Sequence, residues 1–273
     1  MRHLTGSLAA AATALALTAC GGTASSPRAE PTPLSTPAPT PTVTVPPKPD
    51  PPPPADGCYR LGYDEVLAPT TTKRPVPCDG RHTAVTFFVG QYDKSLAVDG
   101  DQVHRIESTV CPRRFAAYVG GSADIRRLSL LRSVWFTPTV EQAGLGAHWF
   151  QCVAIALQGD QHLALLNGPV KGVLSQPAGR DHYALCGTAE PGTPGFEQRI
   201  CALPHSWKAL RTVDFPAGTY PGVDKVRSAG QTPCQDAGRA AAGDPLNYQW
   251  SYQWPTLQQW RAGQTWGTCW APT

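Results

Sequence analysis

The residues best able to do chemistry in this sequence are its cysteines and two histidines that follow cysteines at a fixed spacing. Cys78 is followed four residues later by His82, and Cys201 by His205. Thiolates and imidazoles placed together can ligate zinc or act as nucleophile and base, whereas paired cysteines form disulfides. The sequence contains no Cys-x2-Cys pair, which zinc sites commonly use. We therefore expect disulfides rather than a metal site.

Catalytic signatures do not accompany these histidines. No Gly-x-Ser-x-Gly, His-Glu-x-x-His or Ser-x-x-Lys pattern occurs in the chain. We predict no catalytic residues, no metal and no cofactor, and a hydrolase is the third choice among functions. His82 and His205 stay candidate binding residues, with structural hydrogen bonding as the alternative role.

Beyond residue 57 the sequence repeats itself. Each half contains a Cys-x3-His, a second cysteine 33 residues after the first, and a Gly-x2-Trp-x2-Cys near its end. These features are Cys78, Cys111 and Gly146 to Cys152 in the first half, and Cys201, Cys234 and Gly263 to Cys269 in the second. An ordered series of matches indicates an internal duplication.

Hydrophobic patterns predict an α+β fold for each half, a short and mostly antiparallel sheet packed with one main helix. In the first half we expect strands at 83–90, 133–137 and 149–158, with a turn at 159–160 and a second hairpin arm at 162–166. A helical pattern covers 103–118, and Pro112 should kink or split it. The second half offers strands at 207–215, 248–254 and 265–270 and a helix at 234–242, and it lacks the final hairpin arm.

Four segments follow from composition and from the repeat. Residues 1–20 have a basic start and an Ala- and Leu-rich stretch, as a signal peptide does, and 21–57 carry thirteen prolines in thirty-seven residues. Such a Pro- and Thr-rich segment is typical of a disordered, extended stalk. The modules then cover 58–180 and 181–273, and the Pro and Gly in 174–180 mark a plausible hinge.

The duplication limits how the eight cysteines after residue 57 can pair, because both copies must pair equivalently. We expect first-to-second and third-to-fourth bonds within each module. The predicted disulfides are Cys58–Cys78, Cys111–Cys152, Cys186–Cys201 and Cys234–Cys269.

The end of the N-terminal segment, Leu17-Thr18-Ala19-Cys20 before two glycines, resembles a bacterial lipobox. That resemblance implies that Cys20 is joined to diacylglycerol and becomes the mature N-terminus, and the alternative is an ordinary signal peptide that contains a cysteine. Acyl chains would anchor the protein to the extracytoplasmic face of the cell membrane.

The Cys-x3-His, the helical cysteine, the Pro-Thr followed by Gly-x2-Trp-x2-Cys and the lipoprotein stalk together resemble the actinobacterial septum formation domain family, here in tandem. The resemblance covers about 58–180 and 181–273, and the second copy is truncated at its C-terminus. It implies a place in the cell envelope and a link with cell division, and it implies no catalytic residues.

Composition and aromatic residues narrow the function. A net charge of +3 is too small for an electrostatic nucleic-acid binder. Five of the eight tryptophans fall in the last twenty-four residues, where Trp254 and Trp260 could form a platform for a sugar ring or could simply fill a small core. We expect a non-catalytic binding or scaffold protein whose partner is an envelope protein, with glycan or peptidoglycan binding as the alternative.

Overall fold

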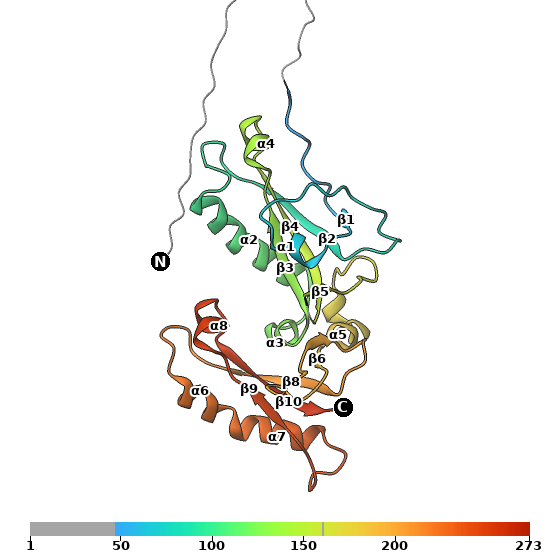
Figure 1. The fold of residues 1–273 in the computed structure, drawn as a ribbon, viewed down its shortest axis with the longest axis vertical. Coiled ribbons are helices and arrows are strands. Elements are labelled where there is room, and N and C mark those ends of the chain that lie inside the picture. Colours follow the sequence, from blue (N-terminus) through green and yellow to red (C-terminus); the bar gives the residue numbers. More distant parts are fainter. Residues whose placement is uncertain (1–46, 160) are drawn as a thin grey trace, which may run out of the picture. The chain divides into compact units, whose positions relative to one another are not determined.

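The computed structural model describes residues 47–159 and 161–273. It contains two five-stranded antiparallel sheets, each with helices packed against it, as Figure 1 shows. The predicted α+β class is therefore confirmed. None of the helices in the described part of the chain combines the length and apolarity that a membrane span needs.

The first sheet is built from strands of the first module in the order β1-β2-β4-β3, with β5 paired to β4. In chain order the elements are β1 (Cys58–Tyr59), α1 (Tyr63–Leu67), β2 (Ala84–Gln91), α2 (Asp101–Val119), α3 (Ala123–Arg127), β3 (Leu131–Phe136), α4 (Val140–Gly144), β4 (Trp149–Gln158) and β5 (His162–Leu163). Strand β4 has the same bounds as the sequence predicts. The expected second hairpin arm shortens to the two residues of β5.

Strand β4 is buried on both faces, which explains its continuous apolar sequence. Phe150 and Cys152 pack in one hydrophobic cluster with Val103 and Cys111 of α2. Val153 alternates to the opposite face and packs with residues from the β1–α1 region. This alternation follows the two-residue period of a strand. Strand β4 therefore contributes side chains to hydrophobic clusters on both faces of the first sheet.

The second sheet has the order β7-β6-β8-β10-β9. Its elements are β6 (Leu185–Gly187), β7 (Gln198–Ile200), β8 (Trp207–Asp214), α6 (Val223–Ala229), α7 (Gln231–Ala241), β9 (Ser251–Gln253), α8 (Leu257–Arg261) and β10 (Trp266–Pro272). Without β7, the order β6-β8-β10-β9 repeats β1-β2-β4-β3 element for element. Shared topology therefore supports the duplication inferred from sequence.

A matching irregularity in both sheets supports the same conclusion. The pairing of β2 with β4 shifts register around Phe87, between Thr86 and Phe88. The pairing of β8 with β10 shifts between Cys269 and Trp270, and there Leu210 is the residue passed over on β8. Phe87 and Leu210 each lie five residues after their repeated histidine. A bulge at the same site in both copies is a feature of the ancestral unit rather than a local defect.

The helices differ from the prediction in where they break. The sequence predicts a kink or a split at Pro112, and the split does not occur, because helix α2 is continuous from Asp101 to Val119. In the second module the helical region divides at Gly230, between α6 and α7. Pro233 is the third residue of α7, where the backbone N–H has no partner within the helix, and α6 ends four residues before it. Proline therefore sets the break in the second module, whereas packing against the sheet keeps α2 in one piece.

The segment expected to be a hinge is helical. Helix η1 (Val173–Ser175) and helix α5 (Pro177–Tyr183) occupy it, and Pro177 begins α5, where a proline is well tolerated. The Gly179 backbone approaches Val173 so closely that a Cβ would lie 2.1 Å from the Val173 carbonyl oxygen. The segment that connects the two sheets is therefore closely packed in this structure.

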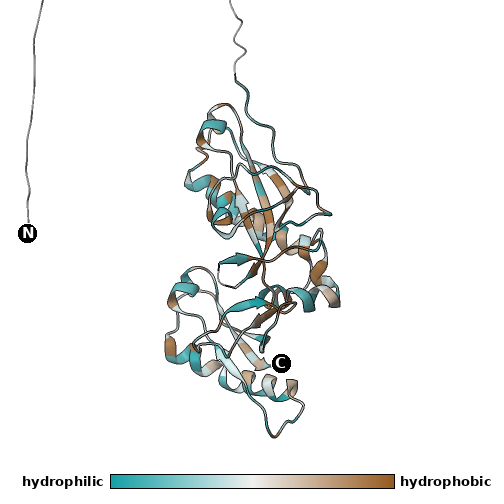
Figure 2. Cartoon of the chain, turned by 45° about the vertical axis from the view of Figure 1, so that its right-hand side comes forward, coloured by the Kyte–Doolittle hydropathy of each residue, from teal (hydrophilic) through white to brown (hydrophobic). Residues whose placement is uncertain are grey.

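One hydrophobic cluster takes residues from both sheets. Leu130 and Leu131 of the first module pack in it with Leu185 and the fully buried Trp270 of the second. Backbone hydrogen bonds join the same region, from Leu130 N to Tyr183 O and from Leu185 N to Leu128 O, each close to 2.9 Å. Figure 2 shows hydrophobic residues gathered along the strands.

Candidate functional site

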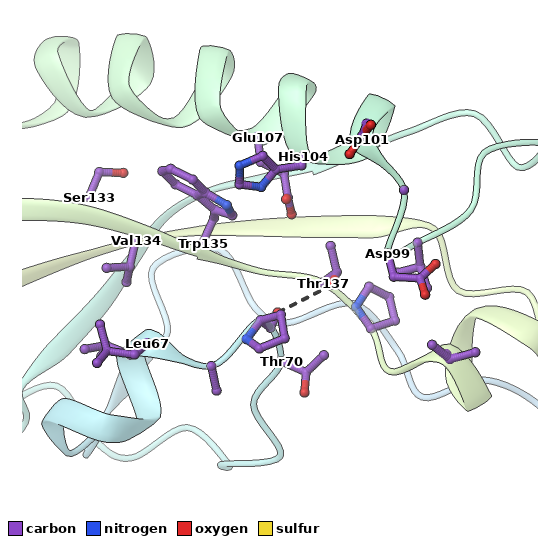
Figure 3. A pocket seen from close by; sticks show the side chains of 17 residues that line it. Leu67, Thr70, Asp99, Asp101, His104, Glu107, Ser133, Val134, Trp135 and Thr137 are labelled. Carbon is purple, nitrogen blue, oxygen red and sulfur yellow. Dashed lines mark hydrogen bonds between the residues drawn. The ribbon is translucent and has the colours of Figure 1, made fainter. Parts of the chain in front are cut away.

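The first module contains a cleft of about 680 Å³ between α2, β3 and the residues that follow α1. Figure 3 shows it with α2 above and β3 crossing beneath. Apolar side chains form much of its wall: Val66, Leu67, Pro69, Val134, Pro138 and Val140. Its volume lies within the range of roughly 300–1,000 Å³ typical of small-ligand sites.

Hydrogen bonds hold the walls of the cleft in place. The backbone N–H of Thr137 at the end of β3 donates to Pro69 O at 3.0 Å, which ties the segment after α1 to the sheet. Thr139 then caps α4, its hydroxyl accepting from Gln142 N at 3.2 Å. The cleft is therefore a built feature, since fixed backbone surrounds it on both sides.

Glu107 is the least expected residue in the cleft. It lies on α2, is 5% exposed, and its Oε1 has no hydrogen-bond partner among the described residues. Burial disfavours its charged form and raises the pKa of its carboxyl to about 7. Burial, and next the charge of Glu107, also raise the pKa of Tyr92. A carboxyl poised near neutrality can bind a cation, accept a hydrogen bond or exchange a proton.

Aromatic rings stand beside this carboxyl. Figure 3 shows the His104 ring and the Trp135 indole in the same cleft as Glu107. The ring centroids of His104 and Trp135 are 6.1 Å apart with a tilt of 56° between the planes. His104 is exposed on α2, whereas Trp135 on β3 is half-buried. An indole face at this position can contact an apolar or cationic group.

The charges around the cleft have one sign. Asp99 and Asp101, both exposed, line it beside the N-terminal end of α2. No lysine or arginine is found among the described residues that line the cleft. Leu67 and Val140 at its edge are 67% and 66% exposed, an apolar surface left open to solvent. The cleft thus combines acidic groups with accessible apolar walls.

The two repeated histidines occupy equivalent positions and make equivalent bonds, away from this cleft. The Nδ1 atom of His82 lies 2.9 Å from Gly80 O, and that of His205 lies 2.8 Å from Leu203 O. His82 is fully buried, and His205 is partly exposed. Each ring contacts a backbone carbonyl oxygen in the turn between its cysteine and the following strand. These contacts favour structural hydrogen bonding as the role of both histidines.

The two tryptophans proposed as a binding platform, Trp254 and Trp260, do not form one in the structure. Trp260 is only 7% exposed, and its ring nitrogen donates to Gly218 O at 2.6 Å. Tyr220 packs edge-on against it, with ring centroids 5.4 Å apart. Trp254 is half-buried, and the Arg227 guanidinium lies 5.0 Å from its ring centroid. These rings fill a small core and do not form one exposed surface.

Four disulfides join the cysteines in the order that the duplication predicts: Cys58–Cys78, Cys111–Cys152, Cys186–Cys201 and Cys234–Cys269. One cluster of described residues, Cys186, Cys201 and His205, brings potential metal-ligand atoms within 4.8 Å of one another. Its two sulfur atoms are bonded to each other, so neither is a thiolate that could ligate zinc. Cys20, the predicted lipidation site, lies outside the described residues.

Sequence reasoning did not single out the cleft residues, although one signal was present. Glu107 lies four residues after Val103 and four before Cys111, both buried, so it shares the core-facing side of the helix. A carboxyl at a helix position where the pattern predicts an apolar residue indicates a candidate functional site. Trp135 lines the same cleft because β3 packs beside α2, and no local sequence pattern predicts that packing.

Comparison with protein families gives one result. A family model described as septum formation matches residues 91–269 and runs continuously through both modules. The matched segment contains α2 and β3 of the cleft and three of the four disulfides. The match therefore begins at the end of β2 and extends through residues of both sheets. No curated protein and no solved structure matches the chain. Because the family model covers more than half of the 273 residues, the chain belongs to the septum formation family.

Proposed function

We propose that this protein is an exported lipoprotein, anchored through Cys20 to the extracytoplasmic face of the cell membrane, that binds a partner during cell division without catalysing a reaction. Family membership supports the link with division. The four disulfides support an oxidising compartment outside the cytoplasm. The proline-rich segment 21–57 would hold the modules away from the membrane.

The observation that carries the binding role is the cleft of the first module with its exposed apolar edge. Leu67 and Val140 leave about two thirds of their surface in water, 67% and 66%. Both border the same concave site, and apolar groups gathered beside a pocket mark places where partners bind. We therefore place the partner's contact at this cleft.

The alternative, a glycan-binding module built on the C-terminal tryptophans, has less support. Stacking on a sugar needs an open ring face, and Trp260 is buried while Arg227 lies against Trp254. An envelope protein is thus the partner class that we favour.

The test is complementation of cells that lack the protein. Cells would receive wild type, a Leu67→Gln, Val140→Gln double variant, or Leu246→Gln, and septum frequency would be counted by microscopy. We expect the double variant to lose most of the activity, because it removes the apolar contact and leaves the core intact. Leu246 is 95% exposed and lies outside the cleft, so Leu246→Gln is the matched control and should restore septa fully.

Immunoblots of the envelope fraction would verify equal amounts of each protein. Full complementation by the double variant would refute the assignment of binding to this cleft, while the family's link with division would stand. If the septa are normal in cells that lack the protein, the proposed role in division itself is refuted.

A further inference from the structure

We propose that the cleft binds a primary alkylammonium group, carried by a lysine-type side chain of an extended partner peptide, with the ammonium against Glu107 and the aliphatic stem against Trp135. This inference rests on the proposed function, because it names the chemistry recognised at the same cleft.

The buried carboxyl of Glu107 is the first argument. Its Oε1 has no partner among the described residues, and the side chain is 5% exposed. A buried polar atom without a partner destabilises the folded protein, and more so if it is charged. A donor that enters the cleft would remove that destabilisation. Glu107 lines the cleft, so its carboxyl is the acceptor that a donor entering the cleft would meet.

The charges of the surrounding residues are the second argument. Asp99 and Asp101 add negative charge at the same cleft, and no described lining residue is basic. A cation is favoured both by Glu107 at close range and by the aspartates during approach. The half-buried Trp135 offers an indole face, the aromatic surface most attractive to cations.

The shape of the site selects the kind of cation. A lysine-type ammonium is a compact charge on a flexible stem of four carbons, whereas a guanidinium needs a planar fork of acceptors. The cleft provides a single buried carboxyl and apolar walls such as Val66 and Val134. An aliphatic stem would pack along the apolar walls, and its ammonium group would pair with the Glu107 carboxyl. Leu67 and Val140 are exposed and line the same cleft, so they would contact residues of the peptide near the bound ammonium.

Binding of this kind must depend on pH. Burial raises the pKa of Glu107 to about 7, and an ammonium ion binds its ionised form. The ionised fraction increases about 30-fold between pH 5.5 and pH 8 for such a pKa, so affinity should rise by a similar factor. The other titratable groups around Glu107 are His104, Asp99 and Asp101 in the cleft and Tyr92 behind it.

The probe is n-hexylamine, with n-hexanol as the uncharged control of equal chain length. The full exported chain carrying Cys20→Ala would be labelled with ¹⁵N at its tryptophan indoles, and the Trp135 signal would be identified from a Trp135→Phe variant. Hexylamine should shift the Trp135 signal saturably at pH 8, with affinity about 30-fold weaker at pH 5.5. Hexanol should bind more weakly and equally at both values.

Two matched variants separate the buried carboxyl from an exposed one. Glu107→Gln should abolish the pH dependence and the preference for hexylamine, while Glu141→Gln, which alters an exposed carboxyl outside the cleft lining, should retain both. Unchanged signals from the remaining tryptophans would show that each variant is folded. Equal binding of the two probes, no binding of hexylamine, or an unaltered response in Glu107→Gln would each overturn the proposal.

The two tests fail independently. Loss of septa with the Leu67→Gln, Val140→Gln protein but no preference for hexylamine would leave the cleft as a binding site for another chemical class. A preference for hexylamine with full complementation by that protein would instead show a cation site that division does not require.

Discussion

The buried Glu107 should make the free energy of unfolding decrease as the pH rises, the reverse of the effect of a salt-bridged carboxylate. Burial raises its pKa from 4.5 in the unfolded chain to about 7 in the folded protein, so the folded state holds the proton more tightly. Its stabilising effect is complete below pH 4.5 and is lost as the pH rises through about 7. The loss between pH 5 and pH 8 should be about 2–3 kcal/mol.

Urea unfolding of wild type and Glu107→Gln at the two pH values measures this loss. The variant should gain about 2–3 kcal/mol relative to wild type on going from pH 5 to pH 8. Glu141→Gln, which alters an exposed carboxyl on α4, is the control and should track wild type. Parallel curves for all three proteins would show that the Glu107 carboxyl is solvated.

Sequence patterns locate individual residues unequally well. The repeated His82 and His205 were found by their spacing, and their equivalent bonds to carbonyl oxygens follow from the duplication. The sequence leaves two roles open for Trp260, a surface platform and the filling of a small core, and its burial favours the core. Its burial depends on Tyr220 and Gly218, about forty residues away, which no local pattern connects to it.

At the scale of elements, the disulfides of the two modules hold helices that differ in how well they are otherwise packed. Helix α2 buries Val103, Phe115 and Val119 as well as Cys111. Helix α7 buries only Cys234 and Gly238. The attachment of α7 to its sheet should therefore depend more on the Cys234–Cys269 bond than the attachment of α2 depends on the Cys111–Cys152 bond.

Serine replacement of each pair tests this difference. Both double variants should lose about 3–4 kcal/mol of global stability by the loop-entropy argument. Hydrogen exchange should show α7 exposed locally in the Cys234→Ser, Cys269→Ser protein, while α2 stays protected in the Cys111→Ser, Cys152→Ser protein. Equal protection of the two helices would contradict the argument from burial.

Element boundaries were predictable where local and tertiary preferences agree. Strand β4 matches its predicted bounds because its apolar run, its burial on both faces and its flanking turn all favour the same structure. Pro112 favoured a break that packing against the sheet overrides. The matching bulges at Phe87 and Leu210 could not be predicted, because register depends on partner strands.

At the scale of the whole molecule, the shared hydrophobic cluster should make the two modules unfold together. Trp270 belongs to the second sheet, is fully buried, and packs in one cluster with Leu130 and Leu131 of the first. Trp270→Ala should cost about 3–5 kcal/mol and lower protection from hydrogen exchange in β4 as well as in β10. Leu246→Ala, at a position 95% exposed, should change neither strand. Loss of protection confined to β10 would show that the modules unfold separately.

The disulfides do not interleave, and each joins a cysteine to the next one along the chain after Cys20. If the chain is exported N-terminus first, as proposed, the two cysteines of each disulfide leave the translocon one after the other. Both partners would then be outside before the cysteines of the next disulfide appear. An oxidase acting on thiols in their order of arrival would form native bonds without later reshuffling. Correct pairing then depends on sequence of appearance, and not on a search among the many pairings that eight cysteines permit.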